Sequence, residues 1–422
     1  MDLEGIARRV QGERAKEIIV QWLDFYKGRR GDLNEKLADA VIKEVENSRM
    51  ASKYEPVPSG IRAGDAGLGS RGVGDHLIHL KLFEISGRKP STFDDAGVMD
   101  DVVVAVDGIH SRLSYFPFLA GFHATKACLR DVMVKGATPL GVLIDVHLAD
   151  DADLSYLFDF EAGVSTVAEA LGVGVLAGST LRIGGDVVIG ERISGGVGAV
   201  GKLGKKFLSR ARIKEGMRIY MTRGNGGGTV SATAIYGGFP EVVEETLRVE
   251  ELLVAKVVNE RFMDKVEAMT DVTNGGIRGD ALEVSEVSKV SFVIDEDEFL
   301  SMINRKVLNM FRALDVDPFG VSIDSLLIFS PADNLEEELR KAGVEVKEIG
   351  YVDRFKDYPI LTISGKRLEP RFRESPYTPV KKVIGNYSPY SMEELKNALD
   401  EASRVAIERK RETLKNLKGG NV

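Results

Sequence analysis

The stretch that decides the fold runs from Thr92 to Ala149 and begins TFDDAGVMDDVVVAVDG at Thr92–Gly108. It continues through KACLRDVMVKGATP at Lys126–Pro139 and ends with LGVLIDVHLA at Leu140–Ala149. The stretch contains seven aspartates, which are Asp94, Asp95, Asp100, Asp101, Asp107, Asp131 and Asp145. Carboxylates that converge cannot all ionise without partners, because like charges repel and burial disfavours the charged form. Hard divalent cations prefer oxygen ligands, so the cluster predicts a Mg²⁺- or Mn²⁺-dependent site.

The composition is that of a soluble globular protein, with 422 residues, 43% hydrophobic and 29% charged. This length suits two domains with extensions. No apolar run is long enough to span a membrane, and the charged start MDLEGIARRVQGERAKE does not resemble a signal peptide. The single cysteine favours a cytoplasmic protein, and the net charge of −8 argues against a nucleic-acid partner. Abundant Lys, Arg and Glu favour a heat-adapted source.

Hydrophobic periodicity predicts an α+β or α/β chain with helical ends. Residues 1–50 show two stripes of apolar residues at helical spacing, and Met392–Lys418 reads as a polar helix. Between these ends strand and helix signals alternate, as in the strands expected at Val102–Asp107 and Gly141–Leu148 around a helix at Leu119–Lys135. We therefore expect an N-terminal helical extension at 1–55, α/β domains at 56–205 and 206–355, and a C-terminal extension at 356–422.

Glycine-rich segments are the second candidate feature. Residues 56–75 contain six glycines, so this segment is either a linker or a loop whose backbone N–H groups close over a phosphate. The loop RGNGGGT at Arg223–Thr229 lacks a phosphate-loop lysine and is better explained as a tight turn. The turn DVTNGG at Asp271–Gly276 should open a helix that presents Asp280 and Glu283 on one face.

Several motifs occur in an order that resembles the superfamily of aminoimidazole ribonucleotide synthetase, selenophosphate synthetase, thiamine-monophosphate kinase and the hydrogenase-maturation nitrile-forming enzyme. They are FDDAGV at Phe93–Val98, VAVDGIH at Val104–His110, RDVMVKGATP at Arg130–Pro139, LIDVH at Leu143–His147 and DVTNGG at Asp271–Gly276. A further segment, GVGDHLIHLKLFEI from Gly72, resembles the glycine-rich N-terminal segment of the hydrogenase-maturation enzyme.

The resemblance implies a fold of two α/β domains, with homodimerisation or higher assembly through a β-barrel built from both N-terminal domains. It implies that aspartates hold metal ions that bridge the phosphates of ATP. By position in the motifs these aspartates are Asp94, Asp95, Asp107, Asp131, Asp145 and Asp271.

The departures from the family pattern bear on function. The family's G(D/E)T motif is here Gly178-Ser179-Thr180, so one metal carboxylate is missing, and Asp186 or Glu191 is a candidate replacement. Asp280 adds an acid at a position that is normally aliphatic, and Arg130 replaces an Asn or Ser. The reactive cysteines of the selenophosphate and hydrogenase-maturation enzymes are absent, which argues against those two activities.

Our first hypothesis is a metal-dependent phosphohydrolase that acts on a phosphate-containing small molecule, because metal ions can bridge phosphate and activate water. One alternative is an ATP-dependent small-molecule kinase or synthetase, and another is a non-catalytic nucleotide- or metal-binding regulator. Asp95 and Asp131 are the expected catalytic residues, and Gly72, Gly74 and Asn274 the expected phosphate or nucleotide contacts. The expected metal ligands are Asp75, Asp94, Asp95, Asp107, Asp131, Asp145, Glu191, Asp271, Asp280 and Glu283.

Overall fold

The chain separates into two compact units in a computed structural model that describes residues 1–87, 93–273, 275–374 and 376–419. Unit 1 comprises residues 1–56, 107–125 and 142–198, and unit 2 comprises residues 57–106, 126–141 and 199–422. The fold is the predicted mixture of α/β elements with helices at both ends. In the described residues no helix is both long and apolar enough to cross a membrane.

Unit 1 begins with three helices, where the two apolar stripes predicted a pair. They are α1 (Leu3–Arg9), α2 (Gly12–Lys27) and α3 (Asp32–Ser48). Ile19 and Leu23 of α2 are buried together with Val41 and Val45 of α3, so the two stripes form a small core of their own. Ile189 of the same unit belongs to this core. The helical extension is therefore packed within unit 1 by apolar burial.

A five-stranded sheet has the strand order β1-β2-β5-β3-β4. Its strands are β1 (Gly97–Met99), β2 (Val102–Gly108), β3 (Ala137–Leu148), β4 (Gly174–Arg182) and β5 (Ile193–Leu203). The helices between them are α5 (Pro117–Val134) and α6 (Ser155–Ala170). Along β2, Val103 is fully buried while Val102, Val104 and Val106 are 43%, 47% and 78% exposed. One face of this strand is therefore apolar and open to solvent.

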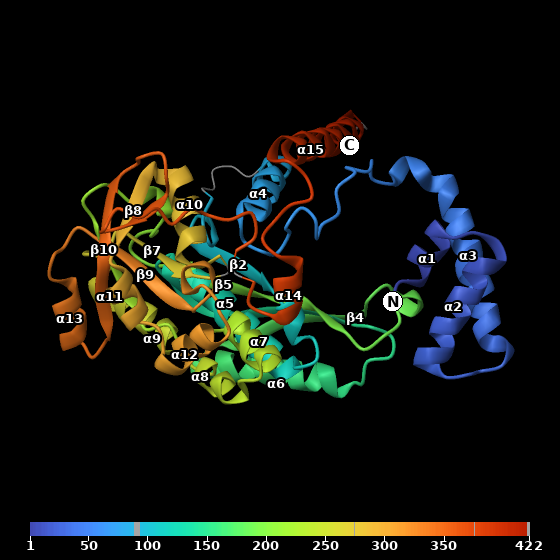
Figure 1. Cartoon of the computed structure of the whole chain (residues 1–422), viewed down its shortest axis with the longest axis horizontal. Helices are drawn as coiled ribbons and strands as arrows, with labels where there is room; N and C mark the ends of the chain where they lie inside the picture. Colours follow the sequence, from blue (N-terminus) through green and yellow to red (C-terminus); the bar gives the residue numbers. More distant parts are fainter. Residues whose placement is uncertain (88–92, 274, 375, 420–422) are drawn as a thin grey trace. The chain divides into compact units, whose positions relative to one another are not determined.

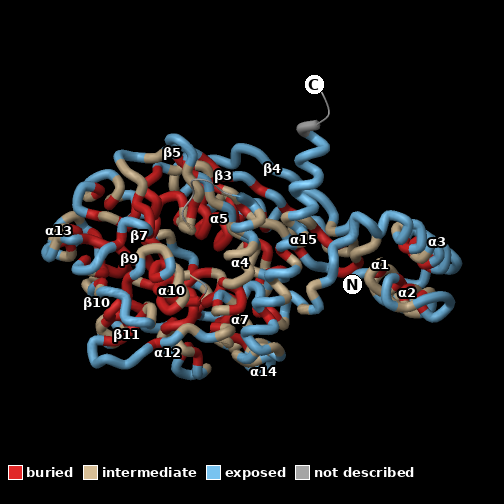
Figure 2. Tube along the Cα trace, turned by 90° about the horizontal axis from the view of Figure 1, so that it is seen from above, coloured by how far each residue is buried: buried red, intermediate tan, exposed pale blue. Residues whose placement is uncertain are grey.

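A six-stranded sheet in unit 2 has the order β11-β8-β10-β6-β9-β7, and only the β11–β8 pair is parallel among the pairings described. The strands are β6 (Arg218–Thr222), β7 (Ala268–Val272), β8 (Val290–Ile294), β9 (Ser325–Ser330), β10 (Val346–Arg354) and β11 (Ile360–Thr362). Every residue of β7, β8 and β9 is buried, which marks the core of this unit (Figure 2). Helices of the same unit pack against all three strands.

The remaining helices of unit 2 connect or cover these strands. They are α7 (Gly228–Gly237), α8 (Val243–Thr246), α9 (Glu250–Val257), α10 (Gly276–Ser288), α11 (Glu296–Ser301), α12 (Arg305–Ala313), α13 (Leu335–Lys341) and α14 (Pro379–Ile384).

The glycine-rich segment leads into α4 (Val73–Ser86), and the terminal helix α15 (Met392–Gly419) lies alongside α4 (Figure 1). Lys81 of α4 pairs with Asp400 of α15 at 2.6 Å, and Lys410 Nζ donates to the Ile85 carbonyl at 2.7 Å. Leu395 of α15 is fully buried. The predicted polar helix is therefore joined to α4 by polar contacts, and one of its leucines is fully buried.

Candidate functional site

The FDD motif places two carboxylates around one lysine in unit 2. Asp94 and Asp95 lie in the turn before β1, and Lys135 follows the last residue of α5. Lys135 Nζ lies 2.5 Å from Asp94 Oδ1, 2.7 Å from Asp95 Oδ2 and 3.0 Å from the Met269 carbonyl oxygen. An ammonium group has three donors. All three directions are therefore used by partners, and the Lys135 side chain is fully buried.

A second cation, Arg210, completes this arrangement. Its guanidinium group pairs with Asp95, donates to Thr270 Oγ1 at 3.1 Å and pairs with Glu283 at 2.7 Å. Its backbone N–H and the Ser209 hydroxyl both donate to Asp94, at 3.2 Å and 2.6 Å from Oδ2. The Thr270 hydroxyl also donates to Asp95 at 3.1 Å. We call Asp94, Asp95, Lys135, Arg210 and Glu283 the FDD cluster.

Electrostatics keep the two aspartates ionised. Burial alone raises the pKa of Asp95, but the positive charges of Arg210 and Lys135 outweigh it and lower this pKa to about 2. Burial likewise opposes ionisation of Asp94, and Lys135 and Arg210 lower its pKa below the ordinary value. Burial also acts against the charge of Lys135, but Asp94 and Asp95 raise its pKa. The FDD cluster is therefore a set of buried ion pairs.

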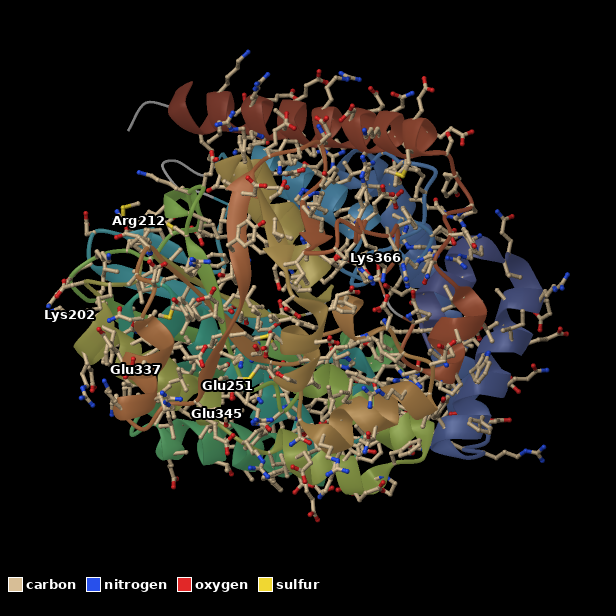
Figure 3. The ribbon with its side chains drawn as sticks, turned by 60° about the vertical axis from the view of Figure 1, so that its left-hand side comes forward. Lys202, Arg212, Glu251, Glu337, Glu345 and Lys366 are labelled. Carbon is tan, nitrogen blue, oxygen red and sulfur yellow. The ribbon has the colours of Figure 1, made fainter. Side chains whose placement is uncertain are left out.

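A second network of buried charges lies under the start of α10. Arg130 of α5 pairs with Asp271, at the end of β7, and its Nη1 lies 2.9 Å from Asp324. Lys126 lies 3.1 Å from Asp324 and 3.2 Å from Glu251. Burial raises the pKa of Glu251, and Lys126 only partly offsets this. Surface carboxylates such as Glu337 and Glu345 are more than half exposed, whereas the Glu251 side chain is 2% exposed (Figure 3).

The RGNGGGT loop is shaped by Asp324. A Cβ atom on Gly227 would lie 2.0 Å from Asp324 Oδ2, so only glycine fits there. Asp324 itself has a φ of 53°, a left-handed conformation that is costly for a residue other than glycine. Lys126 Nζ also donates to the Gly226 carbonyl oxygen at 3.0 Å. The loop is thus packed closely against a buried carboxylate.

Asp280 is a carboxylate of α10 that is 3% exposed. Its Oδ2 accepts no hydrogen bond from the residues that the structure describes. Burial and the neighbouring Asp271 raise the pKa of Asp280 well above the usual range, and Arg210 only partly opposes them. The Asp280 carboxyl is therefore harder to ionise than an ordinary aspartate, and it lies close to the charges of both networks.

The predicted site residues fall into three groups. Asp94, Asp95, Asp271, Asp280 and Glu283 contribute to the buried networks of unit 2, where Asp131 is half-buried on α5. Asp107, Asp145 and Glu191 belong to unit 1, with Asp145 bonded to His147 at 3.1 Å and Glu191 exposed. Asn274 lies outside the described residues. The roles assigned to these residues stay predictions.

The glycine-rich segment is folded against unit 2. Asp75 is buried and accepts hydrogen bonds from the backbone N–H groups of Gly69 and Arg71 at 2.9 and 3.1 Å. A Cβ atom on Gly72 would lie 2.3 Å from the Phe372 carbonyl oxygen, and one on Gly74 would lie 2.4 Å from that of Ala66. The Gly74 N–H donates to Phe372 at 3.3 Å. Close packing therefore accounts for both glycines and for Asp75.

A divalent cation does not fit the FDD carboxylates in this arrangement. A Mg²⁺ ion needs oxygen ligands at about 2.0–2.1 Å in octahedral geometry. The oxygens of Asp94 and Asp95 already accept from Lys135, Arg210, Ser209 and Thr270, and a second cation beside Lys135 Nζ would be repelled. Across the described part of the chain, no three Asp, Glu, His or Cys side chains are grouped so as to hold a metal ion.

The sequence pattern marks Arg130 as a departure from the family motif but does not single out Lys126, Lys135 or Arg210. A usable signal was present, because Lys126, Arg130 and Lys135 are charged residues in the largely apolar stretch Ala124–Gly136. Lys126 and Arg130 are four residues apart and therefore on one helix face. Arg210 and Thr270 gave no comparable signal, since nothing in their local pattern distinguishes them from surface residues.

The paired α/β sheets and the aspartate-bearing motifs define a class of two-domain proteins. The AIR synthase related protein N-terminal domain matches residues 93–203, and the AIR synthase related protein C-terminal domain matches residues 214–358. A protein of Methanocaldococcus jannaschii, MJ1416, is 40% identical over 439 residues that cover 97% of both chains. This chain belongs to the AIR synthase related protein family.

More distant relatives carry named activities. The selenide, water dikinase of Myxococcus xanthus is 31% identical over 186 residues, which cover 42% of this chain and 50% of that enzyme. A putative hydrogenase expression/formation protein of M. jannaschii is 24% identical and covers 69% of this chain and 90% of its own.

Solved structures share the fold. Thiamine-monophosphate kinase of Aquifex aeolicus, complexed with AMPPCP and TMP, has a TM-score of 0.57 and 20% identity, covering 72% of this chain and 96% of that one. Hydrogenase maturation protein HypE in complex with ATP has a TM-score of 0.53 and 16% identity, covering 78% and 98%. The predicted two-domain synthetase-like fold is thereby confirmed.

Proposed function

We propose that this chain is an ATP-dependent kinase or synthetase that acts on a small molecule. The observation that supports the proposal most directly is membership of a family whose named relatives include a dikinase and a kinase. None of the relatives named above is a phosphohydrolase, so the alternative replaces our first hypothesis. Structural relatives bind ATP or AMPPCP on the same fold.

We assign to the buried networks of unit 2 the positioning of charged groups for such a reaction. Phosphoryl transfer depends on positioning and on charge stabilisation. Lys126, Arg130, Lys135 and Arg210 are fixed cations whose partners hold them in place, so they require little reorganisation during the reaction. Asp271 lies at the end of β7 where the DVTNGG turn starts, and its role is to hold Arg130 in position.

The test measures nucleotide binding and turnover separately. Calorimetry with ATP should show binding, and a coupled assay for ADP should show turnover that depends on an added small-molecule acceptor. Asp271→Asn should lower kcat by roughly tenfold or more, because it removes a buried charge partner of Arg130. Asp264→Asn, the same change at an 82% exposed side chain, should leave kcat unchanged.

The outcomes separate the alternatives. ATP binding without turnover across a broad panel of acceptors would favour the regulator. Absence of ATP binding would contradict the proposal. Phosphate release from simple phosphoesters without ATP would restore the phosphohydrolase.

We also propose that the active form is a homodimer. The open apolar face of β2, made by Val102, Val104 and Val106, continues at Met99 of β1, which is 62% exposed. Apolar side chains at alternate positions of neighbouring strands form a contiguous patch. Such patches on soluble proteins mark association surfaces. A second copy of this chain is the occupant that the family resemblance favours.

A further inference from the structure

We infer that Lys135 and Arg210 take the place of a resident divalent cation at the FDD cluster, so that the nucleotide-free protein does not bind free Mg²⁺ or Mn²⁺ there. The inference departs from our own sequence-based expectation that Asp94 and Asp95 are metal ligands.

The first argument is the supply of donors. The two carboxylates together accept contacts from Lys135 Nζ, the Arg210 guanidinium, the Arg210 backbone N–H, Ser209 Oγ and Thr270 Oγ1. A hard cation stabilises carboxylates by neutralising charge and occupying their lone pairs. Here the protein does both with its own groups, which removes the driving force for metal uptake.

The second argument is charge balance. The FDD cluster holds three carboxylates, on Asp94, Asp95 and Glu283, and two cations, on Lys135 and Arg210. Arg71 lies 3.8 Å from Glu283 and supplies a third positive charge at the cluster's more exposed side. Three negative and three positive charges leave no net charge for a divalent ion to offset. Adding Mg²⁺ without expelling Lys135 would place two cations within about 4 Å in a buried site.

The third argument is that the fold fixes both cations independently of the carboxylates. Lys135 also donates to the Met269 carbonyl oxygen, and Gly136, which follows it, has a φ of +82° that ends α5. The Arg210 guanidinium also donates to Thr270 Oγ1 of β7 at 3.1 Å. Displacing either side chain therefore breaks a contact to β7, besides the ion pairs themselves.

The experiment titrates Mn²⁺ into nucleotide-free full-length protein and follows the electron paramagnetic resonance signal of free Mn²⁺. The wild-type protein should leave the signal of free Mn²⁺ undiminished. If Mn²⁺ binds elsewhere on the protein, the wild type and Asp95→Asn should diminish the signal equally. Lys135→Met frees two carboxylates, so it should tighten Mn²⁺ binding by roughly tenfold or more. Lys341→Met, the same change at a 72% exposed lysine, should leave binding unchanged.

Two results would overturn the inference. One is wild-type protein that takes up Mn²⁺ while Asp95→Asn does not. The other is a folded Lys135→Met variant that binds no more Mn²⁺ than wild type. If Lys135→Met does not fold, Lys135→Gln replaces it, since the amide keeps a donor for the Met269 carbonyl but removes the charge. Because no nucleotide is present, these results do not depend on whether the protein uses ATP.

Discussion

At the scale of single residues, the site combines acids that the sequence pointed to with cations that it did not. Asp94 and Asp95 stood out because two acids precede a strand. Arg210, which pairs with Asp95, is 115 positions away in the chain. Sequence periodicity describes neighbours along an element and carries no information about such distant pairs. Lys135 was overlooked for another reason, because a lysine at a helix end ordinarily faces solvent and stabilises the helix dipole.

Asp280 gives a prediction about pH. Its folded-state pKa lies above the unfolded value, so the folded protein holds this proton more tightly. The resulting stability is present below the unfolded pKa of about 4 and is lost as the pH rises toward the folded pKa. Asp280→Asn should therefore raise the free energy of unfolding at pH 7, with little change near pH 4.

Urea denaturation between pH 4 and pH 8 measures this effect. Asp264→Asn, at an 82% exposed side chain, is the matched control and should follow the wild-type profile. An Asp280→Asn variant with the wild-type dependence on pH would show that the Asp280 carboxyl does not retain its proton in the folded state.

At the scale of elements, sequence patterns located most helices and strands but not the purpose of the glycine-rich segment. The stripes in residues 1–50 became α2 and α3, because apolar residues four apart need a shared core. The glycines at 72 and 74 were predicted to contact phosphate, and that role stays a prediction. In the structure, Gly72 leaves room for the backbone carbonyl of Phe372, about 300 residues later in the chain, and Gly74 leaves room for that of Ala66. A glycine that makes room for a ligand cannot be distinguished in the sequence from a glycine that makes room for a distant part of the backbone.

The pairing of α4 with α15 leads to a second prediction. Leu395 is the fully buried apolar anchor of α15. Leu395→Ala should lower the stability of the α4–α15 pair by about 2–5 kcal/mol, because it leaves a cavity. Hydrogen exchange of the backbone amides should then accelerate in both helices while β7 and β9 keep their protection.

Leu417→Ala provides the control within the same helix, since Leu417 is 71% exposed. It should leave exchange in α4 unchanged. Equal exchange in the Leu395→Ala variant and the wild type would mean that polar contacts such as Lys81–Asp400 hold α15 without its apolar anchor.

At the scale of the whole molecule, the exposed valines of β2 lead to a prediction about the proposed homodimer. Val106 is the most exposed of the β2 valines, at 78%. Val106→Lys should abolish the proposed dimer, because burying a lysine in an apolar interface without a partner is costly. Light scattering coupled to gel filtration should then report half the wild-type mass.

Val383→Lys makes the same change on α14, where Val383 is 89% exposed. This variant should keep the wild-type mass. A Val106→Lys protein that also keeps it would place the association surface elsewhere or show that the wild type is a monomer already.

Cys128 has a practical consequence. It is the single thiol in 422 residues and is fully buried in α5, two positions before Arg130. A thiol reagent can reach Cys128 only when α5 opens locally. The rate of thiol labelling therefore measures local opening around the buried charged networks. The natural protein thus contains its own reporter of substrate binding. A substrate that stabilises α5 and its surroundings should slow the labelling of Cys128.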